Sequence, residues 1–269
     1  MENEQMCKIC GGFHMTGECT EGEKTDKPED KGVKSVEKPL SVDNTVAELR
    51  RKEIEQEKVD IIRRSIEDGS FCKVRNKEGN LVDSHLSREQ WISVRTSAFK
   101  EWFGDWENDP ENASTVRDEN GEPQVVYHGT KVNFEAFDTD NKSKFKSGNY
   151  KNVGAFFTSD YNQALEYTYV KPEALKDYDN QNLPTAPDDA RVLRAFLNVK
   201  NLRNFRADKS SLIGMRSLTP EKRSELKAQG YDAVRFRYDT EYVVFDANQI
   251  KSATNNKGVF DSASNNINE

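Results

Sequence analysis

The chain has 269 residues, of which 34% are hydrophobic and 32% are charged, so part of its length is expected to pack poorly. Its net charge of −7 argues against a broad nucleic-acid-binding surface, although a local basic patch is compatible with it. No stretch approaches the roughly 20 apolar residues of a membrane helix, and the N-terminus lacks the basic start and apolar core of a signal peptide. We therefore expect a monomer without a membrane partner, located in the cytoplasm of the producing or a host cell.

Residues 1–22 contain a candidate metal site. Cys7, Cys10, His14 and Cys19 follow the spacing C-x2-C-x3-H-x4-C. Three thiolates and one imidazole satisfy tetrahedral zinc. The spacing resembles a retroviral zinc knuckle, although the middle gap in this sequence is one residue shorter. With four protein ligands the zinc would be structural. The alternative is an unstructured segment with reactive thiols, and a zinc segment could bind single-stranded nucleic acid, bind protein or only stabilise folding.

The next two segments predict a linker, and then a helix followed by a hairpin of two short strands. Residues 23–44 are charged and poor in large apolar side chains, which is typical of a flexible linker. Residues 45–86 predict one long helix, with Asn44 as its cap and Gly69 at its end, followed by a hairpin around the turn signal "NKEGN".

An aromatic helical segment follows. Ser87 and Gln90 have the spacing of a capping box. All three tryptophans of the chain, Trp91, Trp102 and Trp106, lie within the next 16 residues. Aromatic side chains bury large areas, so we expect this cluster to anchor the core of a domain.

From residue 114 onwards, short strands alternate with short helices. A turn is expected at 119–121, and a helix capped by Ser159 and one capped by Thr219 interrupt the strands. Because these helices do not form regular crossovers, the pattern indicates an α+β domain over residues 87–254. Residues 255–269 predict a polar tail. The strands are expected within "QVVYHG", "NVGAFFTSD", "ARVLRAFLNVKNLRNF", "YDAVRFR" and "EYVVFD".

Three segments carry the candidate chemistry. "VVYHGT" ends a strand with His128 and Gly129, "GAFFTSDYNQALEY" joins a strand to a helix bearing Tyr167, and "TEYVVFDANQI" opens a strand with Glu241. Each signal is weak alone. In this order they resemble the ADP-ribosyltransferase family over residues 88–252, and more narrowly its His-Tyr-Glu branch, which includes diphtheria toxin and the poly-ADP-ribose polymerases. The segment "VRTSAFKEWFGDWEN…DENGEPQVVYHGT" is similar to the ADP-ribosyltransferase domains of polyvalent proteins of phages and mobile elements.

This resemblance implies a fold and an activity. The expected fold is a split, mostly antiparallel β-sandwich with flanking helices, preceded by the zinc-binding segment and a helix. The expected reaction transfers a single ADP-ribose from NAD to a protein or nucleic-acid acceptor and releases nicotinamide, as in a toxin or a phage effector. Two alternatives remain: an NAD glycohydrolase, and a silent domain of the same fold that binds NAD or nucleic acid.

The resemblance also implies roles for residues. Glu241, His128 and Tyr167 would be catalytic: Glu241 would bind the 2′-hydroxyl of the nicotinamide ribose and stabilise positive charge, Tyr167 would stack on nicotinamide, and His128 would bind the adenosine ribose. Phe156 replaces a tyrosine of the family, which keeps the stacking surface and loses the hydroxyl. Asp239 does not indicate arginine as the acceptor. The full NAD-binding set would be His128, Gly129, Thr130, Phe156, Phe157, Tyr167 and Glu241.

Two polar loops have open roles. The basic stretch at 142–148 could be solvated or could contact the phosphates of NAD or an acidic target. The long loop at 171–190 could contact the acceptor or could be an insertion without a role.

Overall fold

The computed structural model describes residues 42–140, 153–168, 189–205, 218–236 and 240–269, together with two short strands near the N-terminus. The chain divides into two units, Met1–Ser41 and Val42–Glu269. In the first unit, β1 (Gln5–Met6) pairs antiparallel with β2 (Phe13–His14). The expected linker at 23–44 lies almost entirely outside the described residues.

The second unit begins with the long helix α1 (Val42–Glu67). It starts before Asn44, so Asn44 is not its cap, and it ends before Gly69, whose φ of 75° suits a residue without a Cβ. Its charged sequence leaves only a narrow apolar stripe, through which Ile61 packs on Trp91. No helix in the described part of the chain is long and apolar enough to cross a membrane.

The hairpin and the aromatic helices follow as predicted. β3 (Lys73–Arg75) and β4 (Leu81–Asp83) pair antiparallel, and the capping box of Ser87 and Gln90 starts α2 (Arg88–Ser93). Thr96 then caps a separate helix, α3 (Ser97–Phe103), so the segment forms two helices. The three tryptophans are 1–5% exposed, which confirms that they belong to a core.

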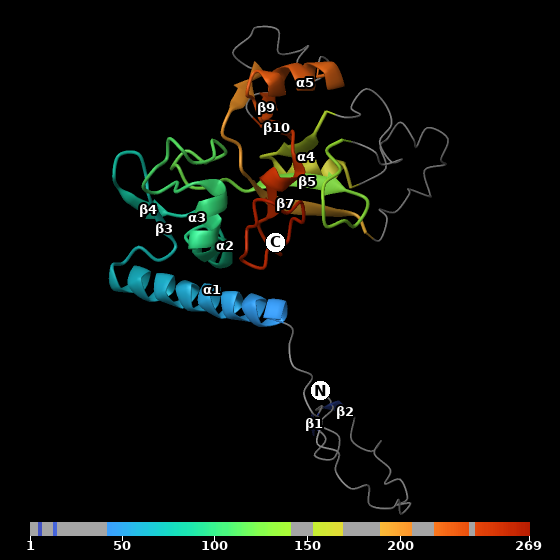
Figure 1. The fold of residues 1–269 in the computed structure, drawn as a ribbon. Coiled ribbons are helices and arrows are strands. Elements are labelled where there is room, and N and C mark those ends of the chain that lie inside the picture. The colour runs from blue at the N-terminus through green and yellow to red at the C-terminus, as the bar shows by residue number, and fades with distance from the viewer. Residues whose placement is uncertain are drawn as a thin grey trace, which may run out of the picture. The chain divides into compact units, whose positions relative to one another are not determined.

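Seven strands form one sheet in the order β11-β7-β5-β6-β10-β9-β8. Figure 1 labels β5, β7, β9 and β10 of this sheet. All neighbours are antiparallel except β8 and β9, which confirms the α+β class with a mostly antiparallel sheet. The strands are β5 (Val126–Thr130), β6 (Ala155–Thr158), β7 (Arg191–Leu197), β8 (Leu202–Asn204), β9 (Ala233–Phe236), β10 (Glu241–Val244) and β11 (Ile250–Ser252).

The centre of the sheet contains a seam. Five residue pairs join β5 to β7 and four join β6 to β10, whereas Tyr127 and Thr158 are the single registered pair between β5 and β6. The two halves of the sheet are therefore joined by a single registered pair, as expected for the split sheet that the sequence resemblance implies.

Two helices lie beside this sheet. α4 (Tyr161–Glu166) is capped by Asp160, whose carboxylate accepts hydrogen bonds from the backbone of Asn162 and Gln163. Ser159, the expected cap, donates its backbone N–H to the carbonyl of Thr240 instead. α5 (Pro220–Ala228) starts at Thr219 as predicted, and its Leu226 belongs to a cluster with Val234 and Val243.

The last 15 residues, expected to be a polar tail, pack on the domain. Phe260 and Ile267 are buried, and the backbone N–H of Ile267 donates to the carbonyl of Glu135. The ammonium of Lys251 donates to the carbonyls of Ser264 and Asn266 at 3.0 Å each. Two apolar side chains and one buried cation thus hold a segment that is polar in composition.

Candidate active site

Glu241 opens β10 and is 5% exposed. It lies opposite Thr158 of β6, and Thr158 lies opposite Tyr127 of β5. Paired residues of antiparallel strands project from the same face of a sheet, so these three side chains form a row across the seam. We call the face that carries this row the Glu241 face.

The Glu241 carboxylate has a defined hydrogen-bond partner that the sequence did not suggest. Gln163 of α4 donates from Nε2 to Oε1 of Glu241. The amide oxygen of Gln163 accepts a hydrogen bond from the Thr158 hydroxyl at 2.7 Å. One signal could have pointed to Gln163: it precedes Tyr167 by four residues, and side chains with this spacing lie on the same side of a helix.

Tyr167 directly follows α4 as its C-cap and is 50% exposed. Its side chain starts directly above Gly129: a Cβ added to Gly129 would lie 2.9 Å from the Cβ of Tyr167 and 1.9 Å from the carbonyl oxygen of Ala164. The structure therefore brings together Gly129 and Tyr167, two residues of the predicted NAD-binding set. The space that glycine leaves is used by the backbone of α4.

Phe156 is half-buried and lies opposite Val243, so it shares the Glu241 face two residues along β6. Such diagonal neighbours are about 7–8 Å apart, within the reach of an aromatic side chain. Two aromatic side chains therefore lie near the carboxylate of Glu241: Phe156 on β6, and the half-exposed Tyr167 at the end of α4. β6 contacts both α4 and β10.

His128 lies on the opposite face, because it follows Tyr127 directly in β5 and side chains alternate along a strand. Its ring contacts Phe137 and Phe157, with ring centroids 4.9 and 5.6 Å apart. Its Nδ1 is 2.7 Å from the carbonyl oxygen of Phe156. A carbonyl only accepts, so Nδ1 carries a hydrogen, and in the neutral ring Nε2 is then the nitrogen able to accept one.

Phe157 and Thr130 are less accessible. Phe157 is 3% exposed within the core cluster of the opposite face. Thr130 is buried, and its hydroxyl bonds both the N–H and the carbonyl of Val132, which closes a local turn. The structure thus places Gly129, Phe156, Tyr167 and Glu241 around the Glu241 face and does not bring His128, Thr130 or Phe157 to it. Asp239, the stretch 142–148 and most of the loop 171–190 lie outside the described residues.

The zinc prediction is not tested, because Cys7, Cys10 and Cys19 lie outside the described residues and only the backbone of His14 is described. In the described part of the chain, His85, Asp118 and Glu119 place possible ligand atoms within 4.8 Å of one another. Two of these three side chains are exposed, and the acids sit in a surface turn.

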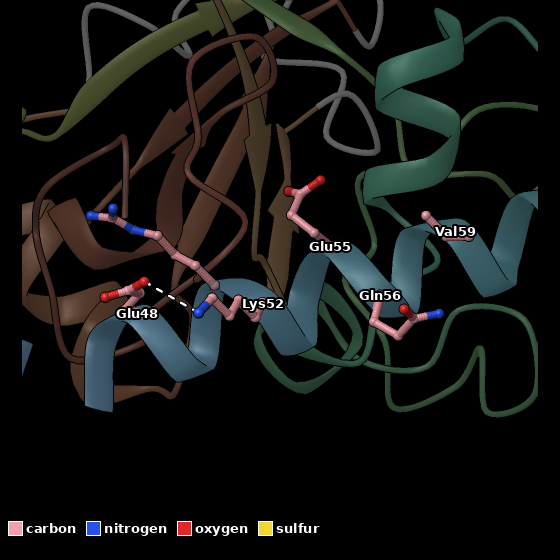
Figure 2. A pocket seen from close by; sticks show the side chains of 6 residues that line it. Glu48, Lys52, Glu55, Gln56 and Val59 are labelled. Carbon is pink, nitrogen blue, oxygen red and sulfur yellow. Dashed lines mark ion pairs between the residues drawn. The ribbon is translucent and has the colours of Figure 1, made fainter. Parts of the chain in front are cut away.

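Figure 2 shows a shallow groove along α1 in which Lys52 pairs with Glu48 at 3.3 Å. All of its lining residues belong to α1, and none comes from the strands or the helix that carry Glu241 and Tyr167. The lining residues are Glu48, Arg51, Lys52, Glu55, Gln56 and Val59.

The fold is a split, mostly antiparallel sheet. A carboxylate stands at the start of a central strand, with an aromatic strand–helix unit beside it. These features fit the class of ADP-ribosyltransferases. The family described as "ADP-ribosyltransferase in polyvalent proteins" matches residues 118–260, more than half of the chain, and the protein belongs to this family. The matched residues include Glu241, Tyr167 and His128. Comparisons with curated proteins and with solved structures gave no match.

Proposed function

We propose that the protein transfers a single ADP-ribose from NAD to a macromolecular acceptor, protein or nucleic acid, and releases nicotinamide. The observation that carries this proposal is the buried carboxylate of Glu241, held beside α4 on the face that also bears Phe156. Family membership supports the reaction class. Burial strengthens the interaction of a carboxylate with a developing positive charge, because less water screens it.

The reaction breaks the bond between C1′ of the ribose and N1 of nicotinamide. The bonding electron pair leaves with the ring nitrogen, which becomes neutral, and positive charge develops at C1′ and the ring oxygen of the ribose. A nucleophilic atom of the acceptor then forms a bond to C1′ and loses its proton. Glu241 contributes by accepting a hydrogen bond from the 2′-hydroxyl and by stabilising this charge electrostatically. A Gln at position 241 would keep a hydrogen bond and lose the negative charge.

Aromatic and backbone groups would hold the leaving group. Tyr167 and Phe156 supply flat faces for the nicotinamide ring, whose cationic form is attracted by an aromatic face. The 50% exposure of Tyr167 supports a role in contact with a ligand. The His128 ring packs on Phe137 and Phe157 on the opposite face of the sheet, so its predicted bond to the adenosine ribose is not part of this proposal.

The test compares two acid-to-amide substitutions. Glu241→Gln is expected to lower NAD turnover about 100-fold or more, because the charge at the reacting ribose is lost. Glu166→Gln makes the same change at an exposed carboxylate on α4 and should leave turnover unchanged. Turnover is measured as nicotinamide release, and NAD labelled in the adenylate half reports transfer to protein or nucleic acid in a cell lysate.

The products separate the candidate functions. Label on a macromolecule supports transfer, whereas free ADP-ribose as the sole product would identify an NAD glycohydrolase. Binding of NAD without nicotinamide release would identify a silent domain. Full turnover in Glu241→Gln would remove Glu241 from the site.

A further inference from the structure

We propose that Gln163 is the positioning residue for Glu241, and that Thr158 acts through Gln163 by fixing the orientation of its amide. This inference rests on the proposed function. It adds two residues to the reaction that neither the sequence motifs nor the family assignment singles out.

The contact joins groups with little freedom to move. Glu241 and Thr158 are each 5% exposed and face each other across β6 and β10. Gln163 reaches them from the first turns of α4. A hydrogen bond to a carboxylate is roughly twice as strong as one between neutral groups. The amide therefore restricts the plane in which the Glu241 carboxylate lies.

The donors and acceptors form a chain with one direction. The backbone N–H of Asp160 donates to the Thr158 hydroxyl oxygen at 3.1 Å, and the hydroxyl donates onward to the amide oxygen of Gln163 at 2.7 Å. An amide oxygen only accepts, so the NH2 group must be the end that faces Glu241. Bonds in such a chain polarise one another, so each is stronger than it would be alone.

The same chain links the carboxylate to the aromatic helix. Asp160 is also the N-cap of α4, and its side chain accepts from the backbone N–H of Gln163. Tyr167 is the C-cap of α4, so the hydrogen bonds of Thr158 and Gln163 connect Glu241 to the helix that Tyr167 follows. Because the partner is a neutral amide, it orients Glu241 without neutralising the charge that the reaction uses.

The experiment measures kcat and KM for NAD in Gln163→Leu, Thr158→Val and Thr158→Ser. Gln163→Leu and Thr158→Val should lower kcat about 10- to 100-fold while KM stays within about twofold, since the loss is in the orientation of a reacting group. Thr158→Ser keeps the hydroxyl and should restore most of kcat. Asn162→Ala removes an exposed amide from the same helix and should match the wild type.

The double variant tests the order of action. If Thr158 acts through Gln163, adding Thr158→Val to Gln163→Leu should cause no further loss of kcat, whereas independent roles would make the two losses multiply. Wild-type kcat in Gln163→Leu alongside a large loss in Glu241→Gln would overturn the positioning role and leave the proposed function intact. Full turnover in Glu241→Gln would instead overturn the proposed function.

A second measurement does not depend on turnover. In 15N–1H correlation spectra, the Gln163 side-chain amide protons should exchange slowly with water, and their shifts should change in Thr158→Val and in Glu241→Gln. Midpoints of thermal unfolding verify that the variants are folded. An amide signal that is identical in wild type and Glu241→Gln would show that the contact is absent.

Discussion

At Gly129, strand β5 and helix α4 approach each other closely. Gly129 belongs to the NAD-binding set that the resemblance implies, yet in the structure the space above it is filled by the carbonyl of Ala164. Glycine is required here because the backbone of α4 approaches β5, and the site depends on that approach because α4 carries Gln163 and Tyr167.

Gly129→Ala should therefore displace α4. A Cβ at 1.9 Å from the Ala164 oxygen forces a backbone shift, so we expect a loss of about 1–3 kcal/mol in the free energy of unfolding together with a large loss of NAD turnover. Gly230→Ala is the matched control: no atom lies within 4 Å of its added Cβ, and its φ of 88° costs about 1 kcal/mol without touching the site. Thermal unfolding and nicotinamide release distinguish the two, and equal activity in both variants would contradict this account.

The sequence predicts some of these residues and not others, for a physical reason. Glu241 and Tyr167 stand at recognisable places in motifs, so order along the chain is enough to find them. The contact between Gln163 and Glu241 depends on the register of β6 against β10 and on the rotation of α4. Neither is set by local pattern, so this contact could be found only in the folded chain.

At the scale of elements, local sequence predicts where helices start better than it predicts which segments pack on the domain. The caps at Ser87 and Thr219 follow from side chains that accept backbone N–H groups, and both are present. The cap of α4 is Asp160 and not Ser159, since the Asp160 carboxylate accepts the backbone N–H groups of Asn162 and Gln163. Composition alone also missed the packing of the C-terminal segment, where Phe260 stacks on Trp102 with centroids 5.9 Å apart.

Lys251 offers a test of that segment. Its side chain is buried, and burial lowers its pKa from the ordinary 10.5, although Asp261 and Glu269 oppose the shift. Lys251→Met leaves the carbonyls of Ser264 and Asn266 without their donor and should cost about 1–3 kcal/mol in the free energy of unfolding. Lys257→Met, at an exposed position, should cost little.

The pH dependence has a definite sign. Between the lowered pKa of folded Lys251 and 10.5, the unfolded chain binds more protons than the folded one, so this lysine makes the protein more stable as pH rises. The stability gap between wild type and Lys251→Met should therefore widen as pH approaches 10.5 in urea unfolding series. A gap that narrows with pH would mean that the ammonium is stabilised, not penalised, by its site.

At the scale of the whole molecule, the division at Ser41 separates the candidate zinc segment from the unit that contains the candidate active site. A chain reduced to residues 42–269 is expected to keep the thermal midpoint and the NAD turnover of the full chain, because the described core lies within Val42–Glu269. If this truncation lowered NAD turnover, the first unit would have a part in catalysis.

The full chain should bind zinc through Cys7, Cys10, His14 and Cys19, and the double change Cys7→Ser, Cys10→Ser should remove the metal. Elemental analysis of the purified full chain and the variant measures this directly. Equal zinc content in both would favour the alternative of a segment with reactive thiols.

At the seam between β5 and β6, His128 also has a structural role. Backbone pairing across the seam is limited to Tyr127 and Thr158, and the His128 ring reaches over to the Phe156 carbonyl where that pairing stops. The imidazole thus adds a side-chain link between β5 and β6 beyond their single registered backbone pair. A His128 variant that loses activity would then report on the loss of this link between β5 and β6 as well as on a lost contact with the substrate.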